Sequence, residues 1–357
     1  MSILRWGWNN YFEAVWKDLE RGNTVPGRVI AQSRGVWRVA GDFGECPAKA
    51  AGKLRLAAEE GSDWPAVGDW VAVELRDLGS AAQIHEVLPR RSRFVRKAAG
   101  KRIAEQVIAA NVDTALLISA LDGDFNPRRV ERYLTQCWES GAKPVIVLNK
   151  ADVCEAPEDK MAAMEKVAMG VAVCAVSAKT GHGFNQLELN LARGQTIVLL
   201  GSSGVGKSTI VNRLLGHAVQ EVREIRESDS RGRHTTTARE LFVLPGGALL
   251  MDTPGLRELQ LWDADEGISQ TFADIESLAT QCRFRNCRHE GEPDCAVQAA
   301  IDSGALALAR LENWRKLQRE LAFLKRKVDP EASHNEKQRI KQLMRGVNKM
   351  YRDREKR

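Results

Sequence analysis

Residues 201–209 are Gly201-Ser-Ser-Gly-Val-Gly-Lys-Ser-Thr209, a match to the phosphate-binding pattern G-x-x-x-x-G-K-[ST]. An apolar run, residues 196–200, precedes this stretch, and a helix-like segment, residues 209–215, follows it. Glycines allow backbone N–H groups to face phosphate oxygens, and the start of a helix adds partial positive charge. We therefore expect a nucleotide phosphate site, here called the cradle, in which Lys207 reaches the β- and γ-phosphates and Ser208 binds Mg²⁺.

Around the cradle, short apolar runs alternate with helix-like segments. Continuous apolar strands separated by helices predict a parallel sheet that is covered on both faces. A further pair of strands is expected on either side of Pro245, within residues 241–250. The expected strands are residues 114–119, 144–148, 171–176 and 196–200, and the expected helices are residues 127–139 and 157–169.

Two short motifs after expected strands suit a guanine base. Asn149-Lys-Ala-Asp152 follows residues 144–148, and its Asp152 carboxylate can accept from two guanine donors that adenine lacks. The Lys150 stem can lie against the base. Ser177-Ala-Lys179 follows residues 171–176 and can present a backbone N–H to the guanine oxygen. Because strand ends in open α/β sheets hold ligands, three such elements together predict GTP rather than ATP.

A third group of residues is expected to sense the γ-phosphate and its metal. Asp252-Thr-Pro-Gly255 follows an apolar run, so Asp252 is a candidate Mg²⁺ ligand and Gly255 a candidate γ-phosphate contact. Thr236, within His234-Thr-Thr-Thr237, is the favoured switch ligand for Mg²⁺. Leu256 stands where many GTPases carry a water-orienting glutamine. His234 is therefore the candidate catalytic group, with an exposed switch histidine as the alternative, and slow intrinsic hydrolysis is expected.

The order of these motifs is unusual. Ras-like GTPases carry the cradle first and N-K-x-D late, whereas this chain carries N-K-A-D at residue 149, the cradle at 201 and D-T-P-G at 252. Relocated chain ends leave the same sheet intact when the original termini lie close together. The sequence therefore predicts a circularly permuted GTPase domain.

A cysteine cluster follows the predicted sheet. Cys282, Cys287, His289 and Cys295 supply three thiolates and one imidazole within 14 residues, which favours a closed, structural Zn²⁺ site. Free thiols near a surface histidine are the alternative. Arginines at 283, 285 and 288 interleave with these residues, and the tail from residue 310 to 357 carries 16 lysines and arginines against 7 acidic residues. These charges suit a nucleic-acid partner, although a solvated helix surface explains the tail equally well.

The N-terminal quarter of the chain shows a different sequence pattern. Short β-like runs broken by glycine, at residues 27–31, 35–39 and 70–75, predict a small barrel, with an OB barrel that binds nucleic acid and a purely structural barrel both possible. The chain has no apolar run of 18 residues and begins without a secretory pattern, so we expect a cytoplasmic location and no membrane partner. Its 43% hydrophobic and 28% charged composition is that of a globular protein.

Taken together, these segments resemble the ribosome small-subunit-dependent GTPase A family, the circularly permuted GTPases of bacterial small-subunit biogenesis. The resemblance covers nearly the whole chain, including Pro65-Ala-Val-Gly-Asp-Trp70, the permuted motifs and Cys282-Arg-Phe-Arg-Asn-Cys-Arg-His289. It implies a catalytic histidine at His234, binding to the 30S ribosomal subunit and its 16S rRNA, and GTP hydrolysis that this subunit stimulates late in maturation.

The expected fold is an α/β P-loop GTPase domain (residues 93–262) between an N-terminal OB-type β-barrel (residues 1–92) and a mostly helical zinc-binding domain (residues 263–357), acting as a monomer. Two rivals remain: phosphoryl transfer to a small molecule, and a nucleotide-gated RNA-binding module with negligible hydrolysis. The expected GTP-contacting residues are Asn149, Lys150, Ala151, Asp152, Ser177, Ala178, Lys179, Gly201, Ser202, Ser203, Gly204, Val205, Gly206, Lys207, Ser208, Thr209 and Gly255, with Lys207 and His234 as the catalytic pair.

Overall fold

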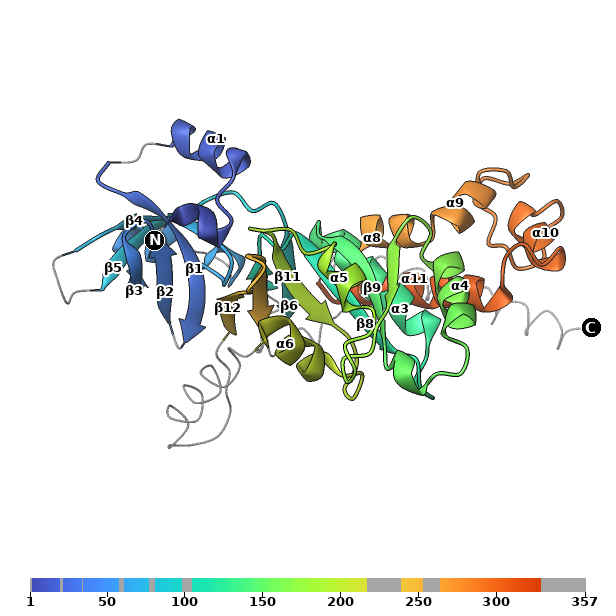
Figure 1. The fold of residues 1–357 in the computed structure, drawn as a ribbon. Helices are drawn as coiled ribbons and strands as arrows, with labels where there is room; N and C mark the ends of the chain where they lie inside the picture. The colour runs from blue at the N-terminus through green and yellow to red at the C-terminus, as the bar shows by residue number, and fades with distance from the viewer. Residues whose placement is uncertain are drawn as a thin grey trace, which may run out of the picture. The chain divides into compact units, whose positions relative to one another are not determined.

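The computed structural model describes residues 2–19, 22–33, 35–57, 61–76, 81–97, 105–216, 239–252 and 264–328. The chain forms two compact units, Met1–Gln260 and Leu261–Arg357. The first holds the barrel and the parallel sheet (Figure 1), and the second holds the cysteine cluster. The finer boundaries expected at residues 92 and 262 stay a prediction.

Five strands close the predicted barrel. The pairing order is β1-β2-β3-β5-β4, and β4 returns to pair with β1, so the sheet closes on itself. The strands are β1 (Val25–Ser33), β2 (Val36–Gly41), β3 (Gly44–Ala50), β4 (Trp70–Glu74) and β5 (Ala82–Val87), with helices α2 (Gly52–Ala57) and η2 (Gly61–Asp63) between β3 and β4. The N-terminal helices η1 (Ile3–Trp6) and α1 (Asn10–Asp18) bury Trp6, Phe12 and Trp16 in the same core.

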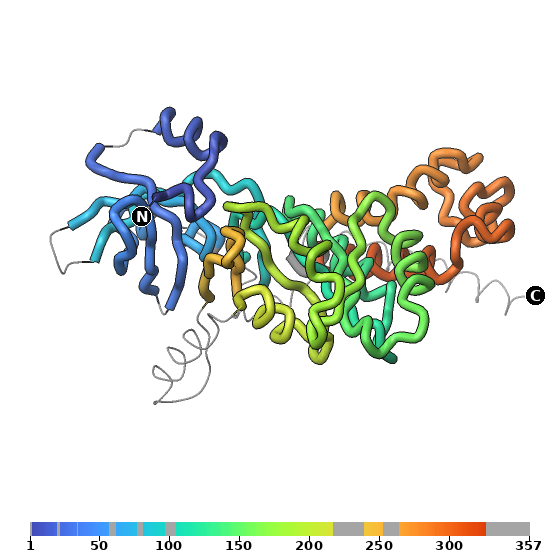
Figure 2. The backbone as a smooth tube through the Cα atoms, in the orientation of Figure 1, coloured from blue at the N-terminus to red at the C-terminus, as the bar shows by residue number. Residues whose placement is uncertain are grey.

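The parallel sheet also forms as predicted. Its order is β10-β9-β8-β11-β13-β12, in which neighbours from β10 to β13 are parallel and β12 is antiparallel to β13. The strands are β8 (Thr114–Ala120), β9 (Lys143–Asn149), β10 (Ala172–Ala175), β11 (Thr196–Leu200), β12 (Arg239–Val243) and β13 (Leu249–Asp252). A separate two-stranded sheet pairs β6 (Arg93–Lys97) with β7 (Glu105–Ala110). β8 and β9 precede the cradle strand β11 in the chain, whose course the colours of the tube in Figure 2 follow, so the parallel sheet forms with its motifs in the permuted order.

Helices cover both faces of this sheet. Alternate β8 residues lie in different cores: Leu117 packs in the core that includes α3 and α4, and Leu116 packs in the core that includes α5 and α6. This alternation follows from the strand period of two. The covering helices are α3 (Pro127–Ser140), α4 (Pro157–Val167), α5 (Phe184–Glu188) and α6 (Lys207–Leu215), and the 3₁₀ turn η3 (Ala151–Val153) follows β9.

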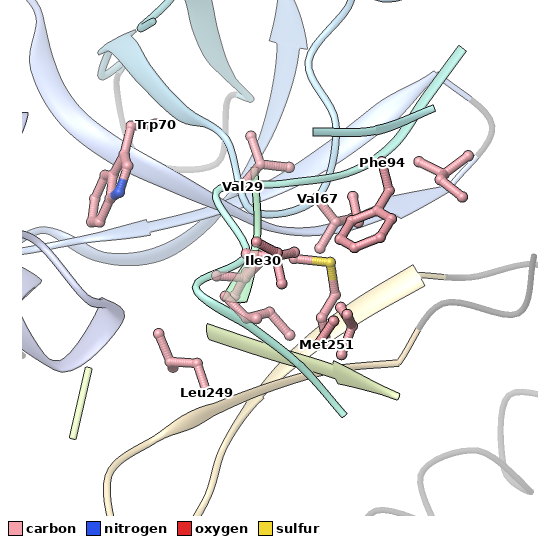
Figure 3. Packing of buried hydrophobic residues seen from close by; sticks show 14 of the residues in the cluster. Val29, Ile30, Val67, Trp70, Phe94, Leu249 and Met251 are labelled. Atoms are coloured by element: carbon pink, nitrogen blue, oxygen red, sulfur yellow. The ribbon is translucent and has the colours of Figure 1, made fainter. Parts of the chain in front are cut away.

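Barrel and parallel sheet are joined edge to edge. β1 pairs antiparallel with β12 through Ala31↔Glu240 and Gln32↔Arg239, which makes one sheet of 11 strands. Arg38 of β2 forms an ion pair with Glu240 across this junction. Figure 3 shows buried side chains gathered here, including Ile30 of β1 and Met251 of β13.

A buried arginine connects the parts that meet at this junction. Arg28 of β1 is 2% exposed. Its guanidinium donates to Trp6 O, Gly68 O at 3.2 Å, Asn111 O at 3.3 Å and Thr196 Oγ1 at 2.8 Å, and it lies over the Trp70 ring. Burial lowers the pKa of Arg28 to about 10, so the side chain stays protonated at neutral pH. One side chain thus ties the N-terminal segment and the barrel to the first residue of the cradle strand.

The second unit is helical, with α8 (Asp265–Thr271), α9 (Ala273–Ala279), α10 (Ala296–Asp302) and α11 (Leu308–Val328). Leu311, Leu317 and Leu321, spaced along one face of α11, are buried in the core of this unit. Arg310, 4% exposed, donates to both oxygens of Asp274, at 2.7 and 2.9 Å. Among the described residues, no helix combines the length and the apolar composition that crossing a bilayer requires.

We predict that Arg28→Met lowers the free energy of unfolding of the protein by roughly 3–5 kcal/mol. Methionine fills a similar volume but leaves buried carbonyl oxygens without a donor. Urea denaturation followed by tryptophan fluorescence measures the change. Arg55→Met, at an exposed position on α2, is the matched control and should stay within about 0.5 kcal/mol of the parent. Equal stability of both variants would refute the role of Arg28.

Candidate nucleotide-binding site and metal cluster

The cradle lies between the end of β11 and the start of α6, as predicted. Lys207 Nζ donates to the backbone oxygens of Gly201 and Ser202, so its ammonium group lies over its own loop. A side chain at Gly201 would meet Ile118 O at 2.6 Å, and one at Gly206 (φ 93°) would meet Asn149 Nδ2 at 2.3 Å. Glycine at these two positions therefore lets the loop lie close against the ends of β8 and β9.

The Asn149 carboxamide joins the cradle to the other predicted base-contacting segment. Its Nδ2 donates to Val205 O at 2.9 Å, and its Oδ1 accepts from Ala178 N at 3.0 Å. Asn149 is 3% exposed, so these bonds are shielded from water. Three segments far apart in the sequence therefore meet at one side chain.

Asp152, the residue expected to select guanine, is held by its neighbour in the same rim. Ser177 Oγ donates to Asp152 Oδ1 at 2.6 Å, and this hydrogen bond lowers the pKa of the Asp152 carboxyl below its usual value. The group is therefore ionised at neutral pH. Its side chain is exposed, so it can accept from a ligand. Lys179 contributes its backbone oxygen to a bond from Arg213.

Lys150 follows Asn149 in the left-handed region (φ 65°) and forms an ion pair with Asp122 at 2.7 Å. The same interaction lowers the pKa of Asp122. Ala151 N donates to Val176 O at 3.0 Å, which fixes the turn between the two base-contacting motifs. The lysine stem is thereby held at the rim where a base would lie.

Three polar residues in this region were not among the site residues predicted from the sequence. Arg213 of α6 donates to Ala178 O at 2.9 Å and supports the Ser177–Ala178 turn. Asp122 and Arg129, which lie in or next to the loop after β8, contact Lys150 and Ser202 respectively. Of the three, Asp122 had a signal in the sequence, because a polar residue just after a parallel strand lies on the ligand-bearing edge.

Of the predicted Mg²⁺ ligands, Ser208 is the second residue of α6 and Asp252 the last residue of β13, so both end at the same rim as the cradle. The other predicted ligand, Thr236, the γ-phosphate contact Gly255 and the catalytic candidate His234 lie outside the described residues. Their assigned roles stay predictions. The described part of the rim offers cationic and backbone groups for phosphates beside an anionic group for a base.

The four predicted metal ligands come together in the second unit. The ligand atoms of Cys282, Cys287, His289 and Cys295 all lie within 4.8 Å of one another. Cys282 Sγ is 3.9 Å from Cys295 Sγ and 3.6 Å from His289 Nδ1, and His289 Nδ1 is 3.4 Å from Cys295 Sγ. Sulfurs on a tetrahedral ion with bonds of about 2.3 Å are about 3.8 Å apart, so the cluster has the size that such an ion requires.

The protein scaffold holds this cluster from two sides. Cys295 caps α10, where its sulfur accepts from Gln298 N at 3.4 Å. His289 is 4% exposed with φ 61°, and Arg315 of α11 donates to its backbone oxygen at 2.7 Å. Three thiols and an imidazole on a supported turn fit a soft or borderline divalent metal, and four such ligands leave no coordination position open for chemistry.

Comparison with known proteins agrees with this geometry. A family profile described as RsgA GTPase matches residues 87–262. The small ribosomal subunit biogenesis GTPase RsgA of Opitutus terrae is 44% identical over 355 residues, 97% of each chain. The protein of that name from Syntrophotalea carbinolica is 44% identical over 90% of each chain.

Two solved structures have the same fold. YjeQ from Thermotoga maritima superposes with a TM-score of 0.63 at 26% identity over 84% of this chain and 98% of that one. YloQ, a circularly permuted GTPase, gives 0.62 at 25% identity over 85% and 96%. A profile described as ABC transporter also matches residues 184–350, a range that includes the cradle motif common to P-loop nucleotide-binding proteins.

We predict that Cys295→Ser lowers the metal content of the purified protein well below one ion per chain, since the buried thiolate ligand is lost. Because binding and folding of such sites are coupled, the variant should also lose helicity in the second unit. Elemental analysis and circular dichroism measure the two effects. Cys46→Ser, at a half-buried cysteine of β3 outside the cluster, is the control. A metal-free parent protein with full helicity would contradict the prediction.

Proposed function

The chain belongs to the RsgA GTPase family, and from this membership we propose that it hydrolyses GTP while bound to the small ribosomal subunit during late maturation. The observation that carries the proposal is the convergence of Asn149, Ser177 and the cradle at one rim. GTP enters there, and the subunit stimulates its hydrolysis. The remaining steps follow from what each side chain at the rim can do.

The base is selected by Asp152. Its carboxylate accepts from the guanine ring N–H and the 2-amino group, while the Ser177 hydroxyl keeps the group ionised and oriented. Adenine would place an acceptor against the same carboxylate and leave a charge unpaired. The Lys150 stem covers one face of the base, and Asp122 holds its ammonium group. Together these contacts favour GTP and GDP over adenine nucleotides.

The phosphates are held by the cradle. Lys207 leaves its own backbone oxygens and pairs with the β- and γ-phosphates, while backbone N–H groups of residues 202–209 donate to the remaining oxygens. Ser208, Thr236 and Asp252 would hold the Mg²⁺ of the bound nucleotide, directly or through water, and that ion would neutralise charge on the β- and γ-phosphates. Gly255 contacts the γ-phosphate, and His234 orients the attacking water in place of the absent glutamine.

The metal of the second unit is one Zn²⁺ with a structural role. Its ligands are Cys282, Cys287, His289 and Cys295, and the chemistry it supplies is the cross-linking of a short segment that has a small core. The cluster turn carries Arg283, Arg285 and Arg288, all exposed, beside the half-exposed ring of Phe284. This arrangement suits RNA phosphates, so the 16S rRNA of the small subunit is the proposed contact.

Other features fit the same proposal. The OB-type barrel is a second candidate RNA-binding surface, and the basic tail from residue 310 adds attraction to a polyanion. A cytoplasmic monomer is the expected form. A nucleotide-gated RNA-binding module without hydrolysis is not favoured, because the relatives that share almost the whole chain are named GTPases.

We predict that Asp152→Asn weakens GTP binding by about 10- to 100-fold, because one charged hydrogen-bond acceptor for the base is lost. The new amide can donate to the carbonyl that xanthine carries in place of the 2-amino group, so affinity for xanthosine triphosphate should rise. Titration calorimetry measures the affinity of the variant for each of the two nucleotides. Asp159→Asn on α4, an exposed aspartate, should change neither value. Retained selectivity for GTP in Asp152→Asn would disprove the base assignment.

We predict that purified small subunits raise the GTP turnover of the chain well above its intrinsic rate, and that large subunits do not. The physical reason is that Leu256 stands where many GTPases carry a water-orienting glutamine, so hydrolysis needs its catalytic groups ordered by the partner. The rate of phosphate release is measured with each ribosomal subunit, and Lys207→Ala is the inactive control. Equal turnover with and without small subunits, at concentrations where binding is observed, would rule out stimulation by the subunit.

A further inference from the structure

The loop between β8 and α3, residues 121–126, carries two aspartates that hold cations at the nucleotide rim. Asp122 pairs with Lys150, and Asp124 pairs with Arg129 at 2.6 Å. In the proposed guanine site Lys150 covers one face of the base, whereas Arg129 has no role there. This arginine lies on the phosphate side of the rim.

The backbone of Arg129 is fixed in position. Asn126 caps α3, and its Oδ1 accepts from Arg129 N at 3.2 Å, while Pro127 begins the helix. From this anchored start, Arg129 Nη1 reaches Ser202 Oγ of the cradle at 2.8 Å. The side chain thus spans from the first turn of α3 to the second residue of the cradle, 73 positions further along the chain.

Two cations therefore meet at one cradle residue. Lys207 Nζ donates to the backbone oxygen of Ser202, and Arg129 donates to its side-chain oxygen. The lysine of such a loop pairs with the β- and γ-phosphates when a nucleotide binds. Arg129 is half-buried and its side chain has four rotatable bonds, so the guanidinium held at this cradle residue is free to turn toward phosphates bound there.

We propose that Arg129 is a catalytic arginine supplied in cis, which leaves Asp124 and donates to the γ-phosphate of bound GTP. The inference rests on the proposed function, since it assumes GTP in the cradle. The triphosphate offers a more highly charged partner than one carboxylate, and the planar guanidinium matches two phosphate oxygens at once. Asp124 keeps Arg129 at the rim until the nucleotide arrives.

The reaction itself is ordinary hydrolysis. The oxygen of water bonds to the γ-phosphorus as the bond from that phosphorus to the β–γ bridging oxygen breaks. The electron pair of the broken bond stays on GDP, and the proton of the water passes to the phosphate released. Arg129 moves no proton, and its two N–H groups neutralise charge that develops on the γ-phosphate and bridging oxygens.

The test compares Arg129→Ala with Arg129→Lys, and with Arg55→Ala, an exposed arginine on the barrel helix α2, as the control for loss of one charge. Single-turnover GTP hydrolysis gives the rate without a ribosomal partner. Binding of fluorescent GDP, with and without aluminium fluoride, reports the ground state and a mimic of the transferring phosphate separately. Thermal unfolding shows that each variant is folded.

We expect Arg129→Ala to lower the single-turnover rate by about tenfold or more, while its GDP affinity stays within about threefold of the parent. Arg129→Lys should recover only part of the lost hydrolysis rate, since an ammonium group cannot match two phosphate oxygens as the planar guanidinium does. The gain in affinity that aluminium fluoride gives to GDP should disappear in Arg129→Ala and persist in Arg55→Ala. Asp124→Ala should keep at least the hydrolysis rate of the parent, because Arg129 leaves Asp124 before it contacts the γ-phosphate.

Two results would overturn the inference. One is an Arg129→Ala rate equal to that of the parent. The other is an equal loss of GDP affinity and rate in both Arg129→Ala and Asp124→Ala, which would make Arg129 a brace for the cradle through Ser202. A parent protein that hydrolyses no GTP under any condition would instead refute the proposed function.

Discussion

The nucleotide rim depends on the parallel register of three strands. Ala120 of β8 lies opposite Asn149 of β9, and Leu117 of β8 lies opposite Leu200 of β11. This register brings the strand ends close enough for the Asn149 carboxamide to bond to both the cradle and the Ser177–Ala178 turn. A shift of one residue would point Asn149 to the other face of the sheet and break both bonds.

The permutation changes what is attached to the sheet rather than the sheet itself. The chain enters through the barrel, whose strand β1 continues the sheet beyond β12. β12 begins at Arg239, shortly after the predicted switch residues 234–237, so the strand that follows them in the chain is hydrogen-bonded to the barrel. Arg28 reinforces the junction from within, since it bonds to the N-terminal segment and to the first residue of β11. Changes near the nucleotide therefore have a short structural route to the barrel.

The second unit is stabilised differently from the first. Its helices are short apart from α11, and its buried core is small. Segments of this size need a cross-link or a buried polar contact to keep one structure. The Cys₃His cluster can supply the first when it holds a metal ion, and the Arg310–Asp274 pair supplies the second. The basic cluster turn is thereby presented on a rigid support.

Local patterns in the sequence were enough to predict the strands of the parallel sheet, three strands of the barrel, several covering helices, the permuted order and the clustering of three cysteines with one histidine, because each depends on spacing within a few residues. The cradle and the N-K-A-D motif could be recognised because each is a short run of consecutive residues. The contacts of Arg28, Arg129 and Asp122 could not be predicted, because their partners lie far away in the sequence: Thr196 is 168 positions from Arg28, and Ser202 is 73 from Arg129. The sequence alone therefore determined which chemical groups the protein carries and in which elements. Only the tertiary structure decided which of them meet, since a buried or bridging side chain takes its partner from the register of distant strands.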